Sequence, residues 1–430
     1  MRKNRLSIHL ILAAASLILA IVLGTVSMIA VYCLPTNRMN DNVGRSQDIM
    51  QLEQSRFTWA PKYDGTGLDG YTDAIMLGNA VFRGTGNPVQ DAMRNPRIRY
   101  EAAGNSPVDS LIRYVNRSEM EPGTQVEYAR YWHGYLVLLK PLLLFFTVSD
   151  LRMMNLFFQF TLMLAVLLEL FRQGGYQLAI PFGAVILCLN PISTALCMQY
   201  SSIYNLMLAG SWLLLHFRLW EQKYGWLLFL WLGIGTAFFD FLTYPVAALG
   251  ICLVLMAVLS QGNWLQKLLK TVYCSFAWCF GYGGMWSGKW VVASILTGEN
   301  VFHDALDQVA LRSGSEVSVS EGAAAASIAN VIGKNLTVYG TNAFLLLGLL
   351  LLLAAVYLVL FRKYRFRFSV SLCVPLLFIA LYPFVWYVVV RNHSLIHYWM
   401  THRNLSVTIF ALCCMVSLSL QKTSGGNPHG

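Results

Sequence analysis

Two acidic residues stand four positions apart in a long polar interval near the start of the chain. The interval covers residues 34–130, lies between apolar runs, and contains the segment Leu68-Asp69-Gly70-Tyr71-Thr72-Asp73. A positioned carboxylate can accept the proton of a hydroxyl group that attacks a substrate. Asp69 and Asp73 are therefore candidate general bases.

Other ionisable residues stand in or beside the apolar runs, where polar groups are costly and often mark a functional site. Asp240 ends one apolar run and is a third candidate for the catalytic or acceptor-binding group. The candidate substrate-binding residues are basic or imidazole groups: His133, Lys289, Arg391, His393, His397 and Arg403. Such a set suits attack on a phosphorylated donor, because a carboxylate takes the proton while cationic groups neutralise the departing phosphate.

Each of these residues also has a structural explanation. Asp73 and Asp240 can cap helices, Lys289 can extend to lipid headgroups, and His133 can be an interfacial aromatic residue. The basic segment 391–403 is harder to explain in this way, because it holds three histidines and two arginines in one short turn. We expect it to bind an anion.

The composition is that of a membrane protein. Hydrophobic residues make up 56% of the 430 residues and charged residues only 12%, with a mean hydropathy of +0.53. Soluble domains carry about a quarter charged residues. The sequence predicts an all-α, polytopic integral membrane protein with about ten transmembrane helices and a long external loop after the first helix.

The net charge of +10 does not indicate a nucleic-acid partner, because the basic residues gather in short connections between apolar runs. These are Arg2, Lys3 and Arg5; Arg172; Arg218 and Lys223; Lys267 and Lys270; and Arg362, Lys363, Arg365 and Arg367. Basic residues concentrate in cytoplasmic loops. A single orientation, with both termini in the cytoplasm, accounts for all these clusters.

The predicted spans are residues 7–32, 150–171, 176–197, 203–220, 226–243, 245–261, 272–296, 341–361, 368–390 and 405–420. Residues 7–32 are too long for the apolar part of a signal peptide and have no A-x-A cleavage site. The predicted regions are a first helix (1–33), an external loop (34–149), a transmembrane core (150–297), a second external loop (298–340) and C-terminal helices with a short tail (341–430).

Three segments outside these spans have recognisable patterns. Residues 69–82 form an amphipathic helix by their spacing, and residues 299–311 form another. Residues 135–147 are apolar but too short to span a bilayer, so we expect an interfacial helix. Residues 313–326 are rich in Ser, Gly, Glu and Ala, which is typical of a loop.

The sequence predicts neither a cofactor nor a metal site. All nine cysteines fall in or at the ends of apolar runs, and their spacing matches no zinc or disulfide pattern. The histidines at 393 and 397 lack the glutamate of a zincin motif. A divalent metal stays possible, but the spacing of the candidate ligands does not support a site for it.

The layout resembles the GT-C superfamily of membrane glycosyltransferases. The likeness consists of a cytoplasmic N-terminus and one helix before a long acidic external loop, the passage Val148-Ser149-Asp150-Leu151-Arg152, which is similar to a family G-S-x-x-x-x-R passage, and a basic external turn late in the chain. The family's usual acid follows the first helix closely, where this chain has Asp41. Asp73 is nevertheless the preferred base, because it opens an amphipathic segment that can lie beside a lipid-linked donor.

The resemblance implies transfer of a sugar from a polyprenyl-phosphate donor to a glycan, lipid or protein acceptor of the cell envelope, on the outer face of a bacterial cytoplasmic membrane. Membrane lipids would be its other partners. Two alternatives stay open: a transporter or flippase for a lipid-linked or anionic solute, and a non-catalytic partner in polysaccharide assembly. Transporters often bind substrates at broken helices, and the glycine-rich residues 281–288 are the candidate for such a break.

Overall fold

The chain is largely helical. The computed structural model describes residues 2–101, 104, 106–116, 123–314, 327–340, 348, 351, 354, 356–358, 360 and 364–422. Helices account for 76% of the structure, and the strands of the described part form short two-stranded pairs. The predicted all-α class is confirmed.

Within the described residues, four helical segments are long and apolar enough to cross a membrane: Ser7–Tyr32, Val148–Gly174, Val370–Val389 and Tyr398–Ser419. They coincide with four of the predicted spans and are compatible with a multi-pass membrane protein. Three further predicted spans correspond to apolar helices of only 14 residues each. The predicted span 341–361 lies mostly outside the described residues, so the number of about ten stays a prediction.

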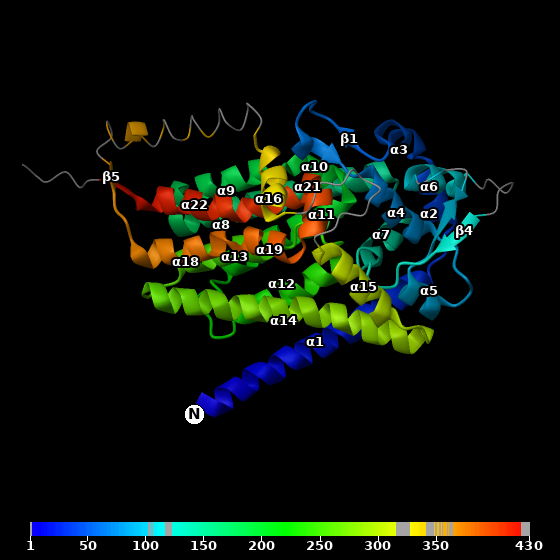
Figure 1. The fold of residues 1–430 in the computed structure, drawn as a ribbon, viewed down its shortest axis with the longest axis horizontal. Coiled ribbons are helices and arrows are strands. Elements are labelled where there is room, and N and C mark those ends of the chain that lie inside the picture. Colours follow the sequence, from blue (N-terminus) through cyan, green and yellow to red (C-terminus); the bar gives the residue numbers. More distant parts are fainter. Residues whose placement is uncertain are drawn as a thin grey trace, which may run out of the picture.

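The long helices form a bundle in which most axes run roughly side by side (Figure 1). Its elements are α8 (Val148–Gly174), α9 (Tyr176–Leu189), α10 (Pro191–Leu196), α11 (Met198–His216), α12 (Trp226–Phe239), α13 (Val246–Leu259), α14 (Trp264–Thr297), α18 (Val370–Ala380), α19 (Tyr382–Val389) and α22 (Ser406–Ser419). The N-terminal helix α1 (Arg2–Tyr32) crosses this bundle obliquely and packs on α14. We call these elements the helix bundle.

Local signals explain where the main helices begin. Thr147 and Asp150 form a capping box at the start of α8, in which each side chain bonds the other residue's backbone N–H. Asn263 and Gln266 form the same arrangement before α14. Between α9 and α10, Asn190 takes a left-handed conformation with φ of 58°, and a proline follows it. That turn ends α9 well short of the predicted boundary at residue 197.

Helix α14 continues without a break through residues 281–288. The glycines there serve close packing instead, since a Cβ on Gly281 would lie 2.3 Å from the backbone oxygen of Leu230 in α12. A Cβ on Gly284 would lie 2.4 Å from the side chain of Leu17 in α1. Small residues let helix backbones approach closely in membrane proteins. The broken helix expected of a transporter is therefore not found here.

Replacing Gly281 by leucine should destabilise the bundle, because backbone atoms of α12 occupy the space that the side chain needs. The expected loss in free energy of unfolding is about 1–3 kcal/mol, the usual range for overpacking. Thermal unfolding of the purified protein in detergent would measure it. Gly283→Ala is the control, since a Cβ there meets nothing within 4 Å; equal melting temperatures for both variants would contradict the packing role.

Residues 34–149, here called the loop domain, gather at one end of the bundle (Figure 1). The helices are α2 (Asn37–Gly44), α3 (Gln47–Glu53), η1 (Asp64–Thr66), α4 (Gly70–Val81), α5 (Pro88–Arg94), α6 (Pro107–Val115) and α7 (Leu136–Leu143). The strands are β1 (Phe57–Thr58) with β2 (Gly67–Leu68), and β3 (Arg97–Tyr100) with β4 (Gly123–Val126), both antiparallel. The start of α8 closes the domain.

The helix predicted over residues 69–82 is α4, and its apolar side faces the core as expected. Met76, Ala80 and Val81 are buried, while Ile75 is half-buried. Helix α7 corresponds to the interfacial segment predicted at 135–147. The large apolar side chain of Phe145, just after it, is 70% exposed, which suits contact with lipid.

The second predicted loop also contains helices. The helix expected at 299–311 is α15 (Val301–Ser313), and α16 (Ile328–Thr337) follows later. Most of the predicted loop at 313–326 lies outside the described residues. The basic segment forms α20 (Arg391–Ile396), α21 (Tyr398–Thr401) and η4 (His402–Leu405), which lead into α22.

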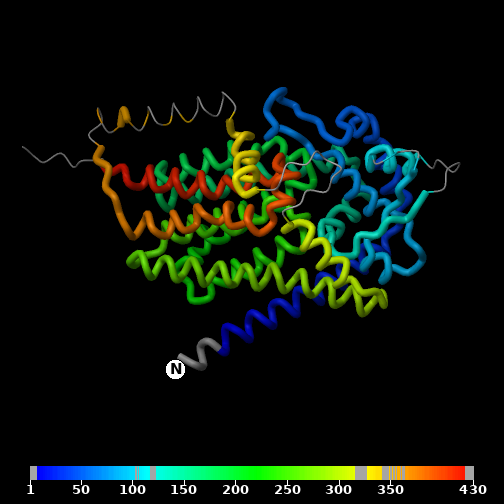
Figure 2. Tube along the Cα trace, viewed as in Figure 1, coloured from blue at the N-terminus to red at the C-terminus, as the bar shows by residue number. Residues whose placement is uncertain are grey.

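The other end of the bundle collects several of the basic connections. Strands β5 (Tyr364–Phe366) and β6 (Leu420–Lys422) pair there, and the hydroxyl groups of Tyr176 and Tyr364 are 3.2 Å apart. Lys270 donates a hydrogen bond to the carbonyl of Trp220, which joins two more of these connections. In Figure 2 the orange and red ends of α18 and α22, next to β5 and β6, lie at the opposite end of the bundle from the blue loop domain. These contacts bring several of the basic connections together, while their placement in the cytoplasm stays a prediction.

Candidate functional site

A cavity of about 690 Å³ lies where the loop domain meets the helix bundle. Its walls come from α4, β3 and α6, from the start of α11, from the end of α15, and from α20 and α21. Its charged lining residues are Asp69, Arg56, Arg97, Arg99 and Arg312. Four guanidinium groups thus face one carboxylate. The volume is within the range of sites for small molecules, roughly 300–1,000 Å³.

Asp69 caps the N-terminus of α4. One carboxylate oxygen accepts the backbone N–H of Thr72 at 3.0 Å, and the other accepts the Thr72 hydroxyl at 3.1 Å. The residue is only 5% exposed, yet it lines the cavity. Burial raises the pKa of Asp69, although hydrogen bonds from Thr72 and Trp399 and the charge of Arg56 act in the opposite direction. A raised pKa strengthens a carboxylate as a base.

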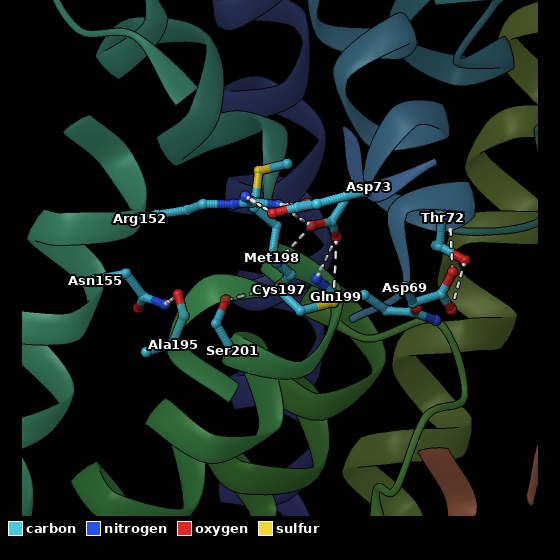
Figure 3. A network of polar contacts seen from close by, with 11 residues as sticks. Asp69, Thr72, Asp73, Arg152, Asn155, Ala195, Cys197, Met198, Gln199 and Ser201 are labelled. Carbon is cyan, nitrogen blue, oxygen red and sulfur yellow. Dashed lines mark hydrogen bonds and ion pairs between the residues drawn. The ribbon is translucent and has the colours of Figure 1, made fainter. Parts of the chain in front are cut away.

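Asp73 lies one turn further along α4 and is not among the lining residues of the cavity. Its two oxygens accept the backbone N–H groups of Met198 and Gln199, each at 3.1 Å, at the start of α11 (Figure 3). A helix N-terminus stabilises negative charge. Burial nevertheless raises the pKa of Asp73 to about 7, with the charge of Arg152 lowering it. This carboxylate ties α4 to α11.

Arg152 supports the same junction from α8. Its Nη1 and Nη2 atoms each lie 2.7 Å from an oxygen of Glu53, and Nη2 lies 3.9 Å from Asp73. The side chains of Arg152 and Glu53 are 10% and 11% exposed. The arginine of the passage that resembles the family motif therefore forms a buried, two-pronged ion pair. It connects the loop domain with the bundle.

Two of the cavity's arginines lie on its bundle side. The guanidinium carbon of Arg56 lies 4.9 Å from the ring centre of Trp399, and its Nη2 is 3.3 Å from an oxygen of Asp64. Arg312, at the end of α15, donates to the hydroxyl of Tyr131 and lies over its ring. A guanidinium group has five N–H donors. Both residues therefore keep donors for an anionic ligand.

His393 and His397 also line the cavity, and their ring centres are 4.6 Å apart. His393 donates from Nε2 to the carbonyl of Leu242 at 2.8 Å. Burial lowers the pKa of His393 well below its usual value and that of His397 to about 4. Both rings are therefore neutral at pH 7, and Nδ1 of His393 is a hydrogen-bond acceptor.

Lys289 and Arg403, two predicted phosphate ligands, bind main-chain carbonyl groups outside the cavity lining. Lys289 donates to the carbonyl of Met93 at 2.9 Å. Arg403 donates to the carbonyls of Gly65 and Trp399 at 3.1 and 2.9 Å. Both residues are fully buried. A buried cation needs such acceptors, so these contacts hold the loop domain against the bundle.

The remaining predicted residues also lie outside the cavity lining. Asp240 accepts the backbone N–H of Thr243 at 2.9 Å and its hydroxyl, so it organises the turn after α12. His133 donates from Nε2 to the carbonyl of Tyr128 at 3.0 Å. Arg391 is half-buried at the start of α20. Of the nine predicted site residues, the structure brings Asp69, His393 and His397 together at the cavity.

Most of the cavity's polar and aromatic lining was not predicted from the sequence. The missed residues include Arg56, Arg97, Arg99, Arg312, Tyr71, Tyr128, Tyr131, Gln199 and Trp399. The sequence contained one local signal for Arg97 and Arg99. Residues two apart on a strand point to the same face, so this pair could have been placed together. Tyr71 lies two positions after Asp69, in the segment 68–73 that holds the two predicted acids. The arginine of α15 could be placed only by the tertiary fold.

The described residues contain no group of three or more His, Cys, Asp or Glu side chains placed to hold a metal ion. Comparison with protein-family models, curated proteins and solved structures finds no match to this chain. The cavity's own geometry is thus the basis for any functional proposal.

Proposed function

We propose that this chain is a membrane glycosyltransferase that moves a sugar from a polyprenyl-phosphate donor to an acceptor of the cell envelope. The observation that carries the proposal is the cavity at the junction of bundle and loop domain. It combines one buried carboxylate, Asp69, with an excess of guanidinium groups and several aromatic rings. Convergent polar groups in an aromatic-lined hollow are typical of binding sites.

The bundle side of the cavity suits the donor. A lipid-linked donor keeps its polyprenyl chain among apolar helices, so its phosphate must lie near the bundle. Arg56 and Arg312 supply N–H donors there, and guanidinium groups match phosphate geometry. Neutral His397 can donate one further hydrogen bond, because its Nδ1 has no partner among the described residues.

Asp69 is the proposed base. The acceptor hydroxyl loses its proton to the Asp69 carboxylate while its oxygen forms a bond to the anomeric carbon of the donor sugar. The bond between that carbon and the phosphate oxygen breaks, and the phosphate leaves with the bonding electrons. Arg56 and Arg312 stabilise the resulting negative charge. Asp73, engaged by backbone amides of α11, positions the start of α4.

The test is donor consumption. The purified chain would be reconstituted in nanodiscs with a panel of polyprenyl-phosphate and polyprenyl-diphosphate sugars, and release of the sugar-free lipid phosphate would be measured. Conversion of at least one donor is expected. If no donor is consumed and a donor instead crosses the membrane of proteoliposomes, the transporter alternative replaces the enzyme. If the chain neither consumes nor transports a donor, the remaining alternative is a non-catalytic partner in polysaccharide assembly.

The proposal includes the full topology: about ten spans, both termini in the cytoplasm and the loop domain outside a bacterial cytoplasmic membrane. Labelling of single cysteines in cells tests it, with the exposed native Cys33 and Cys279 replaced. A cysteine at the exposed position of Lys62 should react with an impermeant reagent, and one at exposed Arg218 should not. The reverse result would invert the orientation.

The rate of transfer should fall as pH drops through the raised pKa of Asp69, because the base must be deprotonated to accept a proton. The acid limb of the kcat/KM profile should therefore lie above the ordinary aspartate pKa of about 3.9. Melting temperatures recorded at each pH would separate unfolding from titration. An acid limb at or below the ordinary value would contradict the role of a buried base.

A further inference from the structure

Two arginines at the loop-domain end of the cavity have no acidic partner among the residues that the structure describes. Arg97 and Arg99 stand on β3 and both line the cavity. Residues two apart on a strand face the same side. Their side chains form no hydrogen bond or ion pair with any residue that the structure describes. Arg94, just before them, in contrast pairs with Glu299 at 2.7 Å.

Holding these two cations together is unfavourable without a counter-ion. Arg97 is half-buried, and burial lowers its pKa, with the charge of Arg99 adding to the effect and nearby Tyr71 opposing it. A cation removed from water needs a compensating charge or hydrogen bonds. The planar guanidinium fork matches the oxygens of a phosphate or carboxylate group. An anionic ligand would supply the compensating negative charge and the hydrogen-bond acceptors.

The arginine pair lies against the second half of α4, on the loop-domain side of the cavity. A Cβ on Gly78 would lie 3.6 Å from the Cβ of Arg97. The charge of Arg97 interacts with Tyr71 at the start of α4, two positions after Asp69. Ser106 and Ser110, from α6, line the cavity with the arginine pair. Side chains of β3 and α6 therefore make the loop-domain end of the cavity polar.

We propose that Arg97 and Arg99 form a second anion-binding subsite, which holds an acceptor sugar carrying a phosphate or carboxylate group. The inference rests on the proposed transfer reaction, in which the donor takes the bundle side and the acceptor takes the opposite end. The two guanidinium groups clamp the acid group of the acceptor. This leaves one of its hydroxyl groups free to reach the Asp69 carboxylate.

Binding of glucose 6-phosphate and of neutral glucose to the purified full chain tests the subsite without any need for activity. Isothermal titration would compare wild type with R97Q/R99Q, with the charge-preserving R97K/R99K, and with R38Q. Arg38 is exposed on α2 and lies outside the cavity lining. Glucose 6-phosphate should bind wild type and R38Q more tightly than glucose does. R97Q/R99Q should lose about tenfold or more in affinity, and R97K/R99K should lose less.

Equal binding of the two sugars to wild type, or unchanged glucose 6-phosphate affinity in R97Q/R99Q, would overturn the subsite. A second arm titrates sugar-free polyprenyl phosphate in nanodiscs, because the donor's phosphate is the other source of the same chemistry. Its affinity should be unchanged in R97Q/R99Q; a loss of about tenfold would assign the arginines to the donor instead. Arginine-dependent sugar binding in a chain that consumes no donor would sustain the subsite and refute the transfer reaction.

Discussion

Asp69→Asn should reduce kcat for sugar transfer by about 10²–10⁴-fold, the usual contribution of a general base. Asparagine has nearly the same shape but cannot accept the proton of the acceptor hydroxyl. It is as good an N-cap as aspartate, so the hydrogen bond from the Thr72 N–H can persist. The melting temperature should therefore change little. Donor turnover and thermal unfolding would be measured on the same preparation.

Two matched variants sharpen this experiment. Asp48→Asn removes an exposed carboxylate from α3, outside the cavity, and should leave turnover unchanged. Asp73→Asn removes one of two acceptors for the amides of Met198 and Gln199. Its loss of activity should accompany a loss of stability. Asp69 is not the base if Asp69→Asn keeps wild-type turnover. The same conclusion follows if turnover is lost only in a stably folded Asp73→Asn protein.

Arg152→Met should lower the free energy of unfolding by about 3–5 kcal/mol, because it leaves the carboxylate of Glu53 buried without its cation. It also removes the cation nearest to Asp73. Replacing both Arg152 and Glu53 with methionine should cost less than the single change, since the unpaired charge of Glu53 is then gone. Unfolding in an SDS titration would give the free energies.

The control for this prediction is the exposed pair Arg218 and Glu221, which are also 2.7 Å apart. Arg218→Met should cost less than about 1 kcal/mol, because water screens an exposed pair. Similar stabilities for Arg152→Met and Arg218→Met would show that the junction between loop domain and bundle does not depend on the buried ion pair.

Local pattern was sufficient to predict several elements. The spacing of apolar residues located α4 and α15, and uninterrupted apolar length located four helices that can span a membrane. These features depend on neighbours along the chain. The early end of α9 was missed because the conformation of Asn190, rather than hydropathy, ends that helix.

The composition of the site was less predictable. Buried Lys289 and Arg403 were expected to bind phosphate. In the structure they donate to the main-chain carbonyls of Met93 and Gly65, which lie far away in the sequence. Sequence shows that a buried cation needs acceptors, but it does not show which acceptors come within reach. Arg97 and Arg312 were missed for the same reason. They meet at one cavity only after β3 has packed on α4 and α6, and α15 on α14 and α20.

The proposed transfer reaction requires that the cavity beside Asp69 receives the lipid-linked phosphate. A polyprenyl phosphate with a photoreactive group next to the phosphate would be crosslinked to the reconstituted chain, and the modified peptides identified by mass spectrometry. Labelling of cavity segments, such as the start of α4 and residues 393–400, is expected, with protection by unmodified polyprenyl phosphate. Labelling confined to the lipid-exposed faces of α1 and α8, without such protection, would contradict it.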